Sequence, residues 1–286
     1  MKIDIKQIQY APGLYLVATP IGNLGDISIR ALETLHGVDI IYCEDTRQTR
    51  KLLQAYDIKT RTSAYHDHSS EAVRKKIVNQ IRGEGLSIAL VSDAGMPLVS
   101  DPGYKLVQDI VRENIPVTSI PGANAVLTAL QLSALPGDSF TFLGFLPHKQ
   151  GARKSLLQQW EKCPVTLIFY EAKQRILKSL QDVTDVYGNR RVVVARELTK
   201  AFEEVLRGSV TEVMEQLQAK ADIKGEFVLL IEAAEEVALP EEEMEKAITS
   251  ALKDNIPIKV LSEEIARKSG WTKKDVYNLA LKLKDK

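Results

Sequence analysis

The residues best suited to chemistry lie in polar loops that follow apolar runs. The segment SDAGMPLVSDPGY (residues 92–104) follows the apolar run 87–91 and carries Asp93, Gly95 and Gly103. The carboxylate of Asp93 can accept hydrogen bonds from hydroxyl or ammonium groups. The glycines permit close approach of the backbone to a ligand, and the prolines of the segment restrict its shape. The segment therefore predicts a small-ligand site built from carboxylates and backbone groups.

Common nucleotide and metal motifs are absent from the sequence. Gly22 and Gly25 follow the first apolar run, but they do not form a dinucleotide-binding G-x-G-x-x-G pattern, and no Walker loop is present. The four histidines do not form a zinc pattern with the two cysteines. His66 and His68 flank Asp67 and could bind a metal, but we favour a solvated turn for this arrangement. We therefore expect a small-ligand site that uses no metal.

The elements that must position these loops form an α/β pattern. Apolar runs predict strands at residues 14–18, 38–43, 62–65, 87–91 and 117–120, with amphipathic helices between them. Such alternation predicts a mostly parallel sheet with helices on both faces, and residues 87–91 are apolar enough to be covered on both sides. Ligands bind at the carboxyl ends of such strands, so four loops should meet at one edge. These loops are residues 19–26, 44–47, 92–104 and 121–124.

Single helix positions can also be predicted from this pattern. Thr46 is expected to cap the helix that follows the second strand. Leu106, Ile110 and Val111 are expected to face inward from the helix after Pro102.

The pattern changes after residue 122. Strands are predicted at residues 140–145, 166–169, 192–195, 204–206 and 227–231, with more antiparallel character and helices near 152–161, 174–186 and 211–219. The acidic stretch 232–245 is interpreted as a boundary, and the remainder as helical, with Val260 among its apolar anchors. The expected fold class is therefore α/β, with two α/β domains at residues 1–121 and 122–235 and a small helical unit at 241–286.

Composition limits the possible functions. The chain has 286 residues, and its 38 Lys and Arg balance its 38 Asp and Glu, so overall charge does not indicate nucleic-acid binding. The two cysteines fit a reducing compartment. The polar start of the sequence and the lack of a long apolar run predict a soluble, cytoplasmic protein without a membrane partner.

Several segments, in this order, resemble one known family. They are TPIGNLGD, YCEDTR, SDAGMPLVSDPGY, IPGANAVLTAL, FLGFLP, FYEAKQR, ARELTKAFEEVLRG and KGEFVLLI. Together they are similar to the tetrapyrrole-methylase superfamily and, within it, to the branch of ribosomal RNA 2′-O-methyltransferases. EDTR and RELTK are specific to that branch. The resemblance covers residues 14–231.

The resemblance implies a fold, a cofactor and an activity. It implies two α/β domains with S-adenosylmethionine in a deep cleft between them, in a homodimer that methylates the ribose of a cytidine in small-subunit ribosomal RNA near the decoding centre. By motif matching, the cofactor-binding residues would be Asp93, Met96, Ala123, Asn124, Tyr170, Ala195 and Gly225. This sequence has Lys173 and Gln174 where the family commonly has a Pro-His pair, which leaves Arg175 as the cation of that segment.

A ribose hydroxyl is a weak acid, so a base should assist the implied reaction by about 10²–10⁴-fold. The candidate bases are Glu44, Asp45, Glu171, Glu197 and Lys200. The alternative interpretation of Asp45 is a helix cap, because a carboxylate is favoured at a helix start. Lys200 could stabilise the oxygen as it loses its proton, or act as a base if burial lowered its pKa. Glu197 with Lys200 is the preferred reacting pair.

Basic clusters are the candidates for RNA binding. Arg47, Arg50 and Lys51 share a helix face through their i, i+3, i+4 spacing and, with Arg175, are predicted to bind substrate. Further clusters occur at residues 74–76, at 153–154 and in the last twenty residues. Residues 262–277 resemble a helix-turn-helix, so the C-terminal unit is predicted to dock RNA.

Two alternatives stay open on the sequence alone. A methyltransferase of this kind could act on a tetrapyrrole or another small molecule, although the basic C-terminal unit and EDTR argue against this. The chain could also be a non-catalytic ribosome-assembly factor. Binding of S-adenosylmethionine would exclude the assembly factor, and methyl transfer to small subunits rather than to a porphyrinogen would exclude the tetrapyrrole enzyme.

Overall fold

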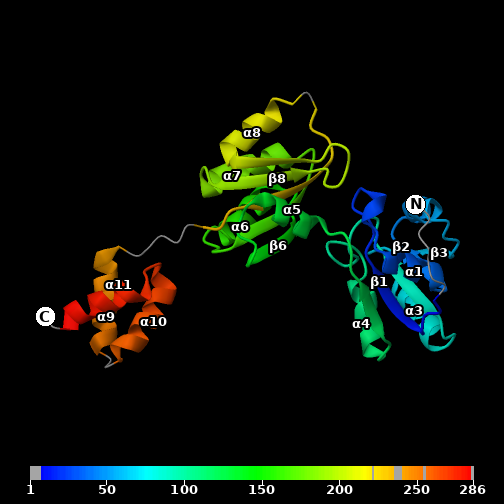
Figure 1. The fold of residues 1–286 in the computed structure, drawn as a ribbon, viewed down its shortest axis with the longest axis horizontal. Coiled ribbons are helices and arrows are strands. Elements are labelled where there is room, and N and C mark those ends of the chain that lie inside the picture. The colour runs from blue at the N-terminus through cyan, green and yellow to red at the C-terminus, as the bar shows by residue number, and fades with distance from the viewer. Residues whose placement is uncertain (1–7, 221, 235–239, 254–255, 285–286) are drawn as a thin grey trace. The chain divides into compact units, whose positions relative to one another are not determined.

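The computed structural model describes residues 8–220, 222–234, 240–253 and 256–284 (Figure 1). Contacts divide the chain into a larger unit of residues 1–161 and 165–232 and a smaller unit of residues 162–164 and 233–286. Within the described residues, the larger unit contains two five-stranded sheets. None of the helices in the described ranges is long and apolar enough to cross a membrane.

The first sheet is parallel, with the strand order β3-β2-β4-β1-β5. Its strands are β1 (Gly13–Val17), β2 (Ile40–Cys43), β3 (Thr62–Ala64), β4 (Ser87–Val91) and β5 (Val117–Ile120). The helices between them are η1 (Leu24–Asp26), α1 (Ile29–Gly37), α2 (Thr46–Ala55), α3 (Glu71–Arg82) and α4 (Tyr104–Arg112). This confirms the parallel α/β sheet expected from the sequence.

Both faces of the central strand β4 are covered. Because successive side chains of a strand point to opposite faces, Ala89 and Val91 join one buried cluster, and Ile88 and Leu90 join another. The first cluster includes residues of α1 and α2, and the second includes residues of α3 and α4. Every residue of β4 is buried, as its apolar sequence predicts.

Two details of these helices differ from the predictions. Leu106 and Ile110 of α4 are fully buried, but Val111 is 57% exposed, because one residue further along a helix turns the side chain about 100° away. Asp45, not Thr46, caps α2, since its side chain accepts a hydrogen bond from the Arg47 amide at 2.8 Å.

The second sheet has the order β6-β7-β10-β8-β9 and is antiparallel except for the β6–β7 pair. Its strands are β6 (Phe140–Phe145), β7 (Thr166–Ala172), β8 (Arg191–Arg196), β9 (Glu204–Ser209) and β10 (Glu226–Ile231). The helices are α5 (Ala125–Ser133), α6 (Gln150–Gln159), α7 (Ile176–Tyr187) and α8 (Val210–Gln218). The predicted antiparallel character is confirmed, and β7 extends three residues beyond the predicted end at 169.

One arginine of a basic cluster proposed for RNA binding lies inside the fold instead. The Arg153 side chain is 4% exposed and forms a 2.5 Å ion pair with the fully buried Asp182. Arg153 also donates to the carbonyl oxygens of Pro147 and His148. The prediction of an RNA-facing cluster at residues 153–154 was therefore wrong for Arg153, whose charge is neutralised inside the fold.

The described part of the smaller unit contains three helices, shown in orange to red in Figure 1: α9 (Glu241–Lys253), α10 (Ile258–Ser269) and α11 (Lys273–Lys284). Met244, Ile248, Leu261 and Val276 form its buried core. Val260 is 47% exposed, so its prediction as an anchor was wrong. The helical C-terminal unit itself is confirmed. Residues 235 and 285–286, at the ends of the predicted domains, lie outside the described ranges, and the domain boundaries stay predictions.

Candidate active site

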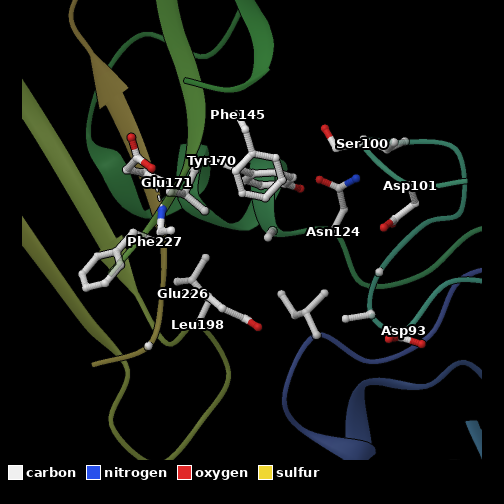
Figure 2. Close-up of a pocket in the computed structure, with 18 of the residues that line it drawn as sticks. Asp93, Ser100, Asp101, Asn124, Phe145, Tyr170, Glu171, Leu198, Glu226 and Phe227 are labelled. Atoms are coloured by element: carbon white, nitrogen blue, oxygen red, sulfur yellow. Dashed lines mark hydrogen bonds between the residues drawn. The ribbon is translucent and has the colours of Figure 1, made fainter. Parts of the chain in front are cut away.

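A cavity of about 510 Å³ in the larger unit is lined by residues of both sheets (Figure 2). One wall consists of residues 21, 93–96, 99–101 and 124–125, which belong to loops at the carboxyl ends of β1, β4 and β5 of the first sheet and to the start of α5. The second sheet contributes residues 145, 170–174, 198 and 225–228. A volume of this size is typical of sites that bind small molecules.

Backbone contacts hold the loops of the first sheet together. Thr19 and Gly95 exchange two backbone hydrogen bonds of 2.8 and 3.0 Å. Gly95 has a φ of +78°, a backbone conformation that residues with a side chain rarely adopt, so a glycine is favoured there. The Asp45 amide donates to the Asp93 carboxylate at 3.1 Å, which joins the loops after β2 and β4. The expected gathering of loops at one edge of the sheet is confirmed.

Aromatic rings form much of the opposite wall. The Tyr170 ring packs edge-on against Phe142, with centroids 4.9 Å apart, and its centroid lies 5.3 Å from that of Phe145. Figure 2 shows Phe145 and Tyr170 on the side of the cavity that faces Asn124 and Asp101. Burial, with the nearby Asp101 charge, raises the pKa of Tyr170 to about 12, so its hydroxyl stays protonated at neutral pH.

Contacts outside the cavity join the two walls. The Asn23 amide donates to the Thr199 hydroxyl at 3.1 Å, which links the loop after β1 to the loop after β8. A side chain at Gly22 would collide with Lys200 and Thr199. The small residue at position 22 therefore allows the two loops to touch.

The predicted cofactor-binding residues divide into two groups. Asp93, Met96, Asn124, Tyr170 and Gly225 line the cavity. Ala123 precedes Asn124 without lining the cavity, and Ala195 is fully buried in β8, where it pairs with the lining residue Val228. The structure thus brings five of the seven residues to one cavity and places the other two behind its wall.

The predicted reacting pair is close together but lies beside the cavity. Lys200 Nζ is 2.9 Å from Glu197 Oε1 and 3.1 Å from Glu226 Oε2. Burial lowers the pKa of Lys200, but its hydrogen bonds to Glu197 and Glu226 outweigh burial and raise the pKa overall. Burial raises the pKa of Glu197, but the hydrogen bonds from Lys200 and the Glu226 amide outweigh burial and lower the pKa overall. Both groups therefore stay charged at neutral pH, and Lys200 is not a ready base.

The acids after β2 also lie outside the cavity lining. Hydrogen bonds from the Arg47 side chain and amide lower the pKa of Asp45 to about 2, which makes it a weak base and fits its role as a helix cap. Burial, together with the charge of Asp93, raises the pKa of Glu44. The catalytic roles of these two residues stay predictions.

The predicted substrate-binding cations differ in exposure. Arg47, Arg50 and Lys51 are all exposed on α2. The Arg175 side chain is only 14% exposed, because it forms a 2.6 Å ion pair with Glu171 and donates to the Leu146 carbonyl. Arg175 thus has partners within the fold, and its predicted contact with substrate stays a prediction.

Sequence reasoning gave no role of their own to Ser100 and Asp101, which also line the cavity. Burial, reinforced by the negative charges of Glu44, Asp93 and Asp67, raises the pKa of Asp101 to about 6, although a hydrogen bond from Ser92 opposes this rise. Ser100 has a φ of +63°, and this unusual conformation marks a tightly constrained loop. The serine and aspartate stand in the quoted segment 92–104, but nothing in their spacing distinguishes them from turn residues.

A comparison with protein families identifies the class of protein to which this chain belongs. The family model described as Tetrapyrrole (Corrin/Porphyrin) Methylases matches residues 13–214. The chain therefore belongs to the tetrapyrrole methylase family, and it is a methyltransferase.

Curated relatives identify the branch of that family. The chain is 45% identical over 272 residues to "Ribosomal RNA small subunit methyltransferase I" of Halalkalibacterium halodurans, covering 93% of each chain. It is 47% identical over 279 residues to the protein of the same name from Vibrio cholerae, covering 95% of each. This similarity places the chain in the branch predicted from its motifs.

A solved structure supports the fold alone. Uroporphyrin-III C-methyltransferase from Thermus thermophilus, complexed with S-adenosylhomocysteine, matches with a TM-score of 0.53 at 17% identity, covering 77% of this chain and 97% of that one. At this identity the tetrapyrrole acceptor of that enzyme is not transferable to this chain. The relatives above 40% identity instead favour the ribosomal RNA methyltransferase branch over a tetrapyrrole methyltransferase or a non-catalytic assembly factor.

Proposed function

We propose that this enzyme transfers a methyl group from S-adenosylmethionine to the 2′-hydroxyl of a cytidine in small-subunit ribosomal RNA near the decoding centre. The observation that best supports this proposal is the shared cavity, in which five predicted cofactor-binding residues meet from two sheets. The names of relatives at 45–47% identity support the RNA substrate.

The chemistry of the cavity fits the cofactor. Asp93 and Asn124 supply polar atoms that could bind ammonium, hydroxyl or amide groups, while Met96 and Tyr170 offer apolar surface to a flat base. Gly225, on the second-sheet side of the cavity, has a φ of +105° and no side chain, which leaves room for the cofactor. When bound there, S-adenosylmethionine would supply a methyl group already activated by a positively charged sulfur. These residues would hold the cofactor and exclude water.

Two further groups of residues are assigned by this proposal. Lys200, paired with Glu197 at 2.9 Å, stays the predicted reacting cation; it would stabilise the acceptor oxygen as that oxygen loses its proton, and Glu197 would hold the lysine in place. Arg47, Arg50 and Lys51 would bind RNA phosphates.

The remaining parts of the proposal concern assembly. The unit at residues 241–286 would dock the substrate, since α11 carries exposed Lys274, Lys282 and Lys284. The working enzyme would be a cytoplasmic homodimer.

Methyl transfer to purified small ribosomal subunits tests the proposal. Subunits from cells that lack this protein are incubated with tritiated S-adenosylmethionine, and the RNA is digested to nucleosides. We expect label in 2′-O-methylcytidine and none in a porphyrinogen offered as an alternative acceptor. Label in the porphyrinogen, or in no RNA nucleoside, would reject the proposed acceptor.

A further inference from the structure

The carboxylates around the cavity differ in their ion-pair and hydrogen-bond partners. Glu171 is 2% exposed and is engaged by Arg175 at 2.6 Å and by the Ser179 hydroxyl at 2.5 Å. Glu226 pairs with Lys200 at 3.1 Å. Both carboxylates thus have a cationic partner, Glu171 inside the fold and Glu226 at the surface, where its side chain is 80% exposed.

Asp101 has a different environment. It is half-buried, and the structure gives it no ion pair with any cation in the described ranges. The ionisable groups that act on it are Glu44, Asp93 and Asp67 from the first-sheet loops and Tyr170 from β7, with Ser92 as its hydrogen-bond partner. Figure 2 shows its side chain beside Asn124, across the cavity from Phe145 and Tyr170. A carboxyl group in this setting is easily protonated and deprotonated.

Asp101 also lies on the same loop as the predicted cofactor residues. It follows Met96 by five positions, and the residues between them include Val99 and Ser100 of the cavity lining. An acceptor group placed beside a cofactor held by Asp93 and Met96 would therefore lie near Asp101. Its pKa of about 6 is close to the operating pH, which favours a general base.

We infer that Asp101 is the general base that accepts the proton of the acceptor hydroxyl, an inference that rests on the function proposed above. As the ribose oxygen forms its bond to the methyl carbon, its proton passes to the Asp101 carboxylate. The carbon–sulfur bond of the donor breaks and the sulfur keeps the electron pair, so the sulfonium becomes a neutral thioether. The protonated Asp101 then returns its proton to water.

The substitution Asp101→Asn tests this assignment because it removes the base and keeps the shape. At saturating cofactor we expect methyl transfer to small subunits to fall by roughly 10²–10⁴-fold, the usual contribution of a general base. Calorimetry without RNA should show unchanged affinity for S-adenosylmethionine. The exposed Glu215 of α8 provides the matched control, and Glu215→Gln should transfer methyl at the parent rate.

A readout independent of activity accompanies the rates. In the parent protein without cofactor, a carboxyl carbon signal in the NMR spectrum should titrate near pH 6, and this signal should be missing in Asp101→Asn. In the parent, the rate should fall at acid pH with a midpoint at or below that value, since the cationic cofactor lowers the pKa of a nearby carboxyl. The Asp101→Asn variant should show no such fall of the rate at acid pH.

Other outcomes overturn the inference in distinguishable ways. An Asp101→Asn variant with the parent rate and pH profile shows that this carboxylate is not the base. A variant with weakened cofactor binding and a normal rate at saturation shows that Asp101 is a cofactor ligand instead. If the parent itself transfers no methyl group to subunits, the proposed function fails and the inference fails with it.

Discussion

Gly225 faces the side chain of Glu197 so closely that a Cβ atom at position 225 would lie 2.5 Å from Glu197 Cγ. Gly225 also has a φ of +105° and lines the cavity. The loop before β10 and the loop after β8 therefore meet at a point where only a hydrogen fits, and this contact shapes one wall of the proposed cofactor site.

The substitution Gly225→Ala should displace Glu197 and narrow the cavity. We expect the affinity for S-adenosylmethionine to fall by about tenfold or more, which corresponds to about 1.4 kcal/mol. Gly188→Ala is the control, because Gly188 also has a positive φ, +67°, but has open space around its missing side chain. The control should lose about 1–3 kcal/mol of stability and bind cofactor normally. Equal affinities in the two variants would contradict the proposed wall.

Lys200→Ala tests the predicted reacting pair. Since Lys200 does not line the cavity, we expect calorimetry to show near-normal cofactor binding and single-turnover kinetics to show slower methyl transfer. The pH at which the rate falls should not move, because Lys200 stays protonated in the parent. Equal losses of binding and rate would show that Lys200 positions the cofactor loop rather than the reacting oxygen.

Asp101 should cost the folded protein stability at neutral pH. Its pKa is raised to about 6 in the fold, so the unfolded chain ionises first, near pH 4. Between these values the folded state binds more protons, and stability falls as pH rises. Urea unfolding of Asp101→Asn should therefore show a gain of about 1–2 kcal/mol at pH 7.5, after allowance for solvent screening, that disappears toward pH 4. A gain that does not depend on pH would refute the raised pKa.

The buried Arg153–Asp182 pair should stabilise the second sheet strongly. Arg153→Ala leaves the fully buried Asp182 carboxylate without its main partner, and urea unfolding should show a loss of about 3–5 kcal/mol. Lys154→Ala serves as the comparison, because the Lys154 side chain is 34% exposed, pairs with Asp185 at 2.6 Å and approaches Asp182 only to 3.8 Å. That change should cost about 0–1 kcal/mol. Similar losses in both variants would contradict the assignment of Arg153 to the interior.

Charge reversal on α11 tests the proposed RNA-docking unit. The triple variant Lys274→Glu, Lys282→Glu, Lys284→Glu should bind small-subunit RNA more weakly, and the slope of its salt dependence should be shallower by about 0.7–0.9 for each phosphate that the variant no longer neutralises. Cofactor affinity should not change. Lys178→Glu, an exposed lysine of α7, is the control. RNA binding that is equally strong in parent and triple variant would remove the C-terminal unit from the RNA interface.

The parallel sheet could be predicted because its signal is local. Each strand of the first sheet is an apolar run followed by turn residues, and the loops after parallel strands must share an edge. The errors also have local causes. Ile110 and Val111 are adjacent and both apolar, so only the exact rotation of α4 decides which is buried. The same applies to Val260, which is exposed although its apolar neighbour Leu261 is buried.

The environment of single side chains could not be predicted in this way. Asp101 stands in a loop of ordinary turn residues, and its raised pKa arises only when burial and the charges of Glu44 and Asp93 combine in three dimensions. Arg153 stands next to Lys154 as if in a surface patch, yet it pairs inside the fold with Asp182, which is far along the chain. Such properties depend on long-range contacts, and residue types and spacing carry little information about them.

Mass spectrometry of small-subunit ribosomal RNA from cells with and without this protein tests the central claim most directly. We predict that one 2′-O-methylcytidine disappears on deletion and returns when the parent gene is supplied, but not when the Asp101→Asn gene is supplied. An unchanged set of ribose methyl groups after deletion would contradict the claim that this cavity holds a methyl donor beside a ribose oxygen.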